Sequence, residues 1–127
     1  MAGLARLKRR PEFLAVAASR RRWVTPGLIL QAARRPEDSD LPPQPRIGFT
    51  ASRKVGIAVL RNRARRRLKA AAEQVLPRYG APGFDYVAIA RTETATRPFS
   101  DLVADMTTAM ERLNARAAPR RDKQGAA

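Results

Sequence analysis

The segment from Lys54 to Lys69, KVGIAVLRNRARRRLK, constrains this chain most because it is both strongly basic and patterned for a helix. After Gly56 the apolar residues recur every three to four positions, which predicts a single apolar stripe on a helix of about 18 residues. The stripe comprises Leu60, Ala64, Leu68, Ala71 and Val75. We expect Pro77 and Gly80 to end this helix.

Basic side chains occupy the opposite side of the predicted helix. The outward arc contains Asn62, Arg63, Arg65, Arg66 and Lys69, with Arg61 at its edge and Arg67 close to the apolar stripe. Like charges at helical spacing repel by a few tenths of a kcal/mol, roughly, for each neighbouring pair. Bound phosphates would supply the missing counter-charge, and the planar guanidinium suits them. A solvated or membrane-binding basic helix is the alternative at this point.

Charge is unbalanced over the whole chain, with 26 Lys and Arg against 11 Asp and Glu and a formal net charge of +15. No acidic residue lies between Asp40 and Glu73, and further basic residues flank a short predicted helix over residues 11–19. These flanking residues are Arg6, Lys8, Arg9, Arg10, Arg20, Arg21 and Arg22. Clustered charge of this kind predicts a polyanion as the partner, either nucleic acid or anionic lipid.

Several classes of protein are disfavoured by what the sequence lacks. With no Cys and no His, disulfides, thiolate metal sites and the commonest general base are absent. The acidic residues are scattered, which argues against a metal-dependent nuclease made of protein alone. No apolar run approaches the 18 residues, roughly, of a membrane span. We expect a cytoplasmic protein, although an Arg-rich start also fits a mitochondrial transit peptide.

The remaining pattern predicts one α+β domain of order αββαβα over residues 1–114, followed by a disordered basic tail over residues 115–127. Strands are predicted over 28–32, 46–52 and 85–90, and Ile47, Phe49 and Ala51 alternate on one face of the second. A last helix begins at Pro98, and its apolar stripe comprises Phe99, Leu102, Met106, Met110 and Leu113. A Pro-rich exposed loop over 34–45 makes an antiparallel hairpin the simplest connection of the first two strands. The small sheet is expected to be packed by the helices.

Two details of the basic segment point more closely to RNA. Gly56 permits a tight turn from the strand into the helix, where free amide groups and the preceding Arg53 and Lys54 could meet a phosphate. Asn62 is a mediocre helix former with no packing duty, and its amide could hydrogen-bond a ribose or a base edge.

The same segment resembles the signature of the bacterial ribonuclease P protein family, in which K-x-G-x-A-V-x-R-N-R is followed by further basic residues. Here Lys54, Gly56, Ala58-Val59 and Arg61-Asn62-Arg63 lie in register with that motif. The resemblance extends more loosely over residues 6–114, through Arg6-Leu7-Lys8 to Phe13, the strand over 46–52, and Ala90-Arg91. A ribosomal or ribosome-assembly protein, or a basic protein that compacts DNA or coats membranes, would not require this register.

The resemblance implies the accessory subunit of an RNA-based endoribonuclease that removes the 5′ leader of precursor tRNA. The catalytic RNA would carry the active site and its Mg²⁺, and no other protein partner would be obligatory. RNA contacts are implied for Arg53, Lys54, Arg61, Asn62, Arg63, Arg65, Arg66 and Lys69. A leader-binding cleft is implied at Phe13, Ile29, Gln31 and Thr50. The fold would be ribosomal-protein-like, with a left-handed strand–helix–strand crossover.

Two positions depart from the family pattern in the implied cleft. Members often carry an aromatic residue one helical turn after Phe13, and another on the first strand, where this chain has Ala17 and Gln31. Stacking on an aromatic ring is worth roughly 1–3 kcal/mol per base. Leader binding is therefore expected to be weaker here or to use Trp23 or Tyr86.

Overall fold

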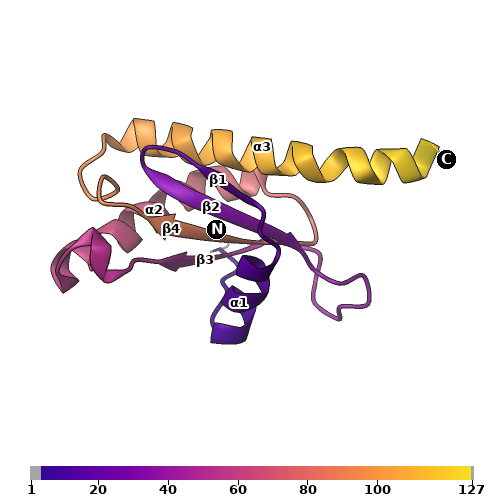
Figure 1. The fold of residues 1–127 in the computed structure, drawn as a ribbon, viewed down its shortest axis with the longest axis horizontal. Helices are drawn as coiled ribbons and strands as arrows, with labels where there is room; N and C mark the ends of the chain where they lie inside the picture. The colour runs from indigo at the N-terminus through magenta and orange to yellow at the C-terminus, as the bar shows by residue number, and fades with distance from the viewer. Residues whose placement is uncertain (1–3, 127) are drawn as a thin grey trace.

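The computed structural model describes residues 4–126, with side chains described through residue 116. Three helices and a four-stranded sheet make up a single α+β unit, shown in Figure 1. In chain order the elements are α1 (Arg10–Ala18), β1 (Arg22–Val24), β2 (Leu28–Arg34), β3 (Arg46–Thr50), the 3-10 helix η1 (Arg53–Val55), α2 (Ala58–Tyr79), β4 (Phe84–Ala90) and α3 (Phe99–Ala126).

The strands lie in the order β1-β2-β4-β3, so the sheet is mixed. β2 pairs antiparallel with β1 and β4, whereas β3 pairs in parallel with β4. The predicted hairpin between β2 and β3 is therefore wrong, because β4 lies between them. The loop that joins β2 and β3 passes the start of β4, with hydrogen bonds from Arg35 N to Gly83 O and from Gly83 N to Pro43 O. The strand–helix–strand unit that the sequence predicts is β3–α2–β4, and its left-handed crossover stays a prediction.

Alternation along the strands gives the sheet two different faces. Leu28, Leu30, Ile47, Phe49 and Tyr86 belong to the main core, which includes the buried stripes of α2 and α3. The predicted inward positions of α3 agree, because Leu102, Met106, Met110 and Leu113 are all buried. The other face carries a small apolar cluster under α1. Figure 1 shows α1 on the opposite side of the sheet from α3.

A network of charges fixes α1 and the central strands. Asp85 on β4 accepts hydrogen bonds from Arg35 and, through both of its oxygens, from Arg46. Arg46 also contacts Glu12 of α1, with 3.0 Å between Nη1 and Oε2. Glu12 Oε1 accepts from the backbone N–H groups of Lys8 and Arg9 at the start of α1. Arg35 and Arg46 are thus neutralised by acidic partners within the protein, although both contribute to the excess of basic residues in the sequence.

The predicted elements differ from the structure in one missed strand and in several boundaries. The order αββαβα omits β1, a three-residue strand that is too short to show a period of two. Pro77 lies inside the last turn of α2, and Gly80 rather than Pro77 marks its end. α3 is traced to Ala126, past the predicted boundary after residue 114, in a segment rich in the good helix formers Ala and Arg.

Candidate nucleic-acid interface

The basic helix begins at a tightly built turn. Ser52 caps η1 by accepting a hydrogen bond from Lys54 N, and Gly56 follows with φ of 140°, a conformation that other residues rarely adopt. A side chain at Gly56 would also meet Leu60, since its Cβ would lie 2.8 Å from Leu60 Cδ1. Arg61 folds back and donates from Nη1 to the Gly56 carbonyl at 3.1 Å. The path from β3 into α2 is therefore specified by side chains on both sides of the glycine.

The rest of α2 has the two sides that the sequence predicts. Ala64, Leu68, Ala71 and Val75 are buried, with exposed fractions of 1% or less. Leu60 is the exception in the predicted stripe, because 39% of it is exposed. The outward residues, together with η1, form what we call the η1–α2 surface. It comprises Arg53, Lys54, Arg61, Asn62, Arg63, Arg65, Arg66 and Lys69.

Most of the η1–α2 surface is accessible and lacks acidic partners. Arg53, Lys54, Arg63, Arg66 and Lys69 are exposed, and none forms an ion pair with any acidic side chain in the described part of the chain. The structure thus gathers these predicted residues into one surface. Their charges face solvent and are available to an anionic ligand.

Two members of the η1–α2 surface interact with each other. Asn62 Oδ1 accepts a hydrogen bond from Arg65 Nη2, and Arg65 is half-buried. The carboxamide oxygen of Asn62 thus orients the Arg65 guanidinium, and its amino group remains available as a donor for other contacts. The sequence identified Asn62 as unusual, but only the structure shows this pairing.

Arg67 is half-buried and contacts the rest of the protein, although it is adjacent to the exposed Arg66. It donates to the carbonyls of Thr94 and Arg97 in the loop between β4 and α3. In the same loop, Thr94 Oγ1 donates to the Gly27 carbonyl, and Arg97 is paired with Asp105 of α3. Arg67 therefore ties the basic helix to the rest of the domain.

The four residues predicted for the leader cleft lie on the α1 side of the sheet. Strand register puts Ile29, Ile89 and Thr50 in one row across three strands, and Gln31, Val87 and Gly48 in the next. Phe13 packs against the small cluster under α1, and its ring covers Gly48, whose Cβ would lie 2.5 Å from the ring edge. Phe13, Ile29, Gln31 and Thr50 are all half-buried, so each keeps some accessible surface.

Neither aromatic residue considered as a substitute lies on the α1 side. Tyr86 is fully buried in the main core, and its hydroxyl donates to Asn114 and accepts from Ala81 N. Burial raises the pKa of Tyr86 to about 12. Trp23 of β1 lies opposite Leu30 of β2, a residue of the main core. The guanidinium groups of Arg112 and Arg116 on α3 lie 5.7 and 5.0 Å from the centre of the Trp23 ring. The α1 side thus lacks a replacement for the missing aromatics.

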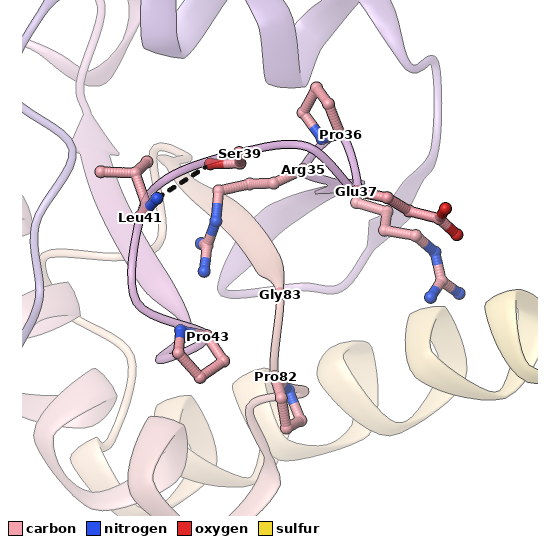
Figure 2. A pocket seen from close by; sticks show the side chains of 9 residues that line it. Arg35, Pro36, Glu37, Ser39, Leu41, Pro43, Pro82 and Gly83 are labelled. Carbon is pink, nitrogen blue, oxygen red and sulfur yellow. Dashed lines mark hydrogen bonds between the residues drawn. The ribbon is translucent and has the colours of Figure 1, made fainter.

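A pocket lies at the end of β2 that is remote from β1. It has a volume of about 260 Å³ and is lined by residues of the β2–β3 loop and by Pro82 and Gly83, as Figure 2 shows. Its rim is held by a hydrogen bond from Leu41 N to Ser39 Oγ of 3.2 Å. The buried charge there, Arg35, is paired with Asp85, and the other acidic or basic side chains at the pocket, Arg34 and Glu37, are half-buried and exposed.

Nothing in the described region resembles a protein catalytic centre. No three His, Cys, Asp or Glu side chains among the described residues gather closely enough to hold a metal ion. The helices of this region are all too polar or too short to cross a membrane. Fold and surface together place the chain in the class of small basic α+β proteins that present an accessible cationic helix on a compact support.

Comparison with known proteins supplies the family. The sequence pattern of the ribonuclease P family, described as "Ribonuclease P", matches residues 1–114. The ribonuclease P protein component of Paramagnetospirillum magneticum is 52% identical over 114 residues, covering 90% of this chain and 86% of that protein. That of Ruegeria pomeroyi is 46% identical over 114 residues, covering 89% of each chain.

Solved structures show the same fold at lower identity. The ribonuclease P protein of Thermotoga maritima superposes with a TM-score of 0.68 and 21% identity, covering 84% of this chain and 96% of that one. The Staphylococcus aureus protein gives 0.66 and 19%, with 84% and 92% covered. The chain belongs to the bacterial ribonuclease P protein family, whose members are subunits of the RNA-based endoribonuclease that matures the 5′ end of tRNA.

Proposed function

We propose that this chain binds the catalytic RNA of ribonuclease P through the η1–α2 surface. The observation that carries the proposal is the division of its arginines. Arg35, Arg46 and Arg97 have acidic partners, whereas Arg53, Arg63 and Arg66 have none among the described residues. Unpaired guanidinium groups gathered on one helix suit the phosphate oxygens of folded RNA.

We propose further that the α1 side of the sheet holds the single-stranded 5′ leader of precursor tRNA. Phe13 supplies the aromatic ring, while Ile29, Gln31 and Thr50 supply an apolar and hydrogen-bonding floor across β2 and β3. With Ala17 exposed and Gln31 in place of an aromatic, bases have one ring to stack on. Leader affinity should accordingly be lower than in relatives with three aromatics, by roughly 1–3 kcal/mol for each lost stack.

In this assignment the protein carries no catalytic group. The RNA subunit supplies the active site and its Mg²⁺, and the protein raises the local positive charge and holds the substrate leader. The domain that does this spans residues 1–114, and residues 115–127 form a basic tail. The site of action is the cytoplasm, with no membrane and no second protein required.

Reconstitution tests both proposals. The purified chain is added to a transcript of a bacterial ribonuclease P RNA at low Mg²⁺, with precursor tRNA carrying a 5′ leader as the substrate. We expect the chain to stimulate cleavage. Failure to stimulate at any protein concentration would refute the assignment to the catalytic RNA.

A matched substrate separates the two surfaces. If the α1 side binds the leader, the chain lowers KM for a precursor with a leader of several nucleotides more than for one with a single leader nucleotide. Equal effects on the two precursors would leave RNA-subunit binding in place and remove the leader assignment.

A further inference from the structure

Three apolar side chains are exposed where the basic helix begins. Ile57 and Val59 are 69% and 70% exposed, and Leu60, which packs on Gly56, is 39% exposed. We call these three residues the apolar tip. Isolated exposed apolar residues are common on protein surfaces, but three within four positions form a patch that favours contact with a ligand. In Figure 1 the first turns of α2 lie at one end of the molecule, away from α1 and from the end of α3.

The apolar tip is part of the η1–α2 surface rather than a separate region. Val59 precedes Arg63 by four positions and Arg66 by seven, so the three side chains follow one line along the outward side of α2. Exposure agrees with this placement, because Val59, Arg63 and Arg66 are exposed. Ala64 and Leu68, on the other side of the helix, are fully buried. The surface therefore changes along its length from apolar to cationic.

Cationic residues border the apolar tip on both sides along the chain. Arg53 and Lys54 of η1 precede it, and Arg61 and Arg63 follow it. No described acidic side chain is paired with Lys54 or Arg63. A ligand for this region must combine an apolar face with negative charge on either side of it.

We propose that Ile57 and Val59 form a docking surface for an unpaired nucleobase of the RNA that the η1–α2 surface binds. This inference rests on the proposed function and deepens it. A nucleobase has an apolar face and is flanked along its strand by two phosphates, for which Lys54 and Arg63 are the nearest unpaired cations in sequence. We specify an unpaired base because, within an RNA helix, stacking and the narrow major groove hide the faces of paired bases from protein side chains.

The tip is built to accept such a base without rearrangement. The Ser52 cap of η1, the positive φ of Gly56 and the Arg61 hydrogen bond to the Gly56 carbonyl all restrict the backbone beneath it. A preformed surface loses little conformational freedom on binding, so apolar contact there contributes to affinity. This contribution is independent of salt, unlike that of the phosphate contacts.

The test uses the full-length chain and a transcript of a bacterial ribonuclease P RNA, without substrate. The double variant Ile57→Ser/Val59→Ser is compared with Arg66→Ala and with Leu41→Ser, an exposed apolar residue outside the surface. We expect the double variant to bind roughly 5- to 50-fold more weakly, with the slope of log K against log salt unchanged. Arg66→Ala should flatten the slope by up to about one unit, and Leu41→Ser should change neither quantity.

Chemical probing of the RNA gives a readout that a folding defect does not imitate. With the wild-type chain at saturation, one or a few unpaired bases become protected from base-modifying reagents. At saturation with Ile57→Ser/Val59→Ser these bases regain reactivity, whereas the backbone protection due to the cationic residues persists. Val59→Ile, which keeps the apolar surface, should retain the protection.

Three results would overturn the inference. Unchanged affinity and an unchanged base footprint in the double variant would mean that the tip touches no base. Self-association of the RNA-free wild-type chain, lost in the double variant, would make the tip a protein interface. The apolar tip would have only a structural role if the double variant lost binding because its melting temperature fell, while the milder variants Ile57→Ala and Val59→Ala bound normally. A wild-type chain that does not bind the RNA would instead refute the proposed function.

Discussion

Asp85 holds Arg46 through two parallel hydrogen bonds, 2.9 Å from Nε to Oδ1 and 2.8 Å from Nη2 to Oδ2. The same carboxylate accepts from Arg35 at 2.7 Å, so one acid on β4 pairs with Arg46 of β3 and with the arginine that directly follows β2. In a chain with a net charge of +15, this arrangement distinguishes arginines that support the fold from exposed arginines, such as Arg53, Arg63 and Arg66, that have no acidic partner among the described residues.

Asp85→Asn should therefore be strongly destabilising. The variant leaves the buried Arg35 without a counter-charge and Arg46 with Glu12 alone. Breaking a buried pair by removing one partner costs about 3–5 kcal/mol. Urea unfolding followed by circular dichroism measures the loss. Asp38→Asn, in the exposed loop, is the matched control and should change stability by less than about 0.5 kcal/mol.

Gly48→Ala should displace Phe13. The added methyl group would lie 2.5 Å from two atoms of the ring, which have to move. We expect a loss of about 1–3 kcal/mol in stability, as for other overpacked sites. In a double-mutant cycle, Phe13→Ala should relieve most of this loss because it removes the clash. Additive effects of the two substitutions would show that the ring does not press on Gly48.

Arg67→Ala and Arg66→Ala should have opposite effects although the two residues are adjacent. Arg67 bonds two carbonyls of the β4–α3 loop, so its removal should cost about 1–3 kcal/mol of stability and leave the salt dependence of RNA binding intact. Arg66 is exposed, so its removal should spare stability and flatten the salt dependence. Thermal unfolding and filter binding at several salt concentrations measure both. The same pattern in both variants would contradict this division.

Glu12 should contribute stability that depends on pH. Hydrogen bonds from the Arg9 and Lys8 backbone hold the pKa of Glu12 below its ordinary value of 4.5, and Arg46 adds to this despite a small opposing effect of burial. Since the pKa is lower in the folded state, the stabilisation is present above pH 4.5 and is lost as pH falls through the folded value.

Glu12→Gln should therefore be less stable than the wild type at neutral pH, by about 1 kcal/mol. The difference should shrink in acid. Urea unfolding at each pH measures the difference in the free energy of unfolding between the two proteins. If this difference stayed constant down to pH 2, titration of Glu12 would be excluded as its cause.

Local patterns predicted the parts of this protein that depend on neighbours along the chain. The stripe of α2 and that of α3 were recognisable because a helix repeats every 3.6 residues, roughly, whatever lies beside it. The alternation of Ile47 and Phe49 was likewise confirmed by their burial on one face of β3. The basic arc of α2 follows from the same periodicity, and the register of its residues with a family motif predicts the ribonuclease P family.

Tertiary structure decided everything that depends on residues distant in sequence. The sequence carries no signal that β4 pairs between β2 and β3, because strand pairing depends on how the α2 crossover folds back, and the loop after β2 suited a hairpin equally well. Nor could it divide the arginines. Arg46 and Arg67 are engaged within the protein, and their partners, Asp85 and the Thr94 carbonyl, lie 39 and 27 positions away in sequence. The sequence by itself thus determined that a cationic helix exists and which family the chain belongs to, while packing selected which of the charges face solvent.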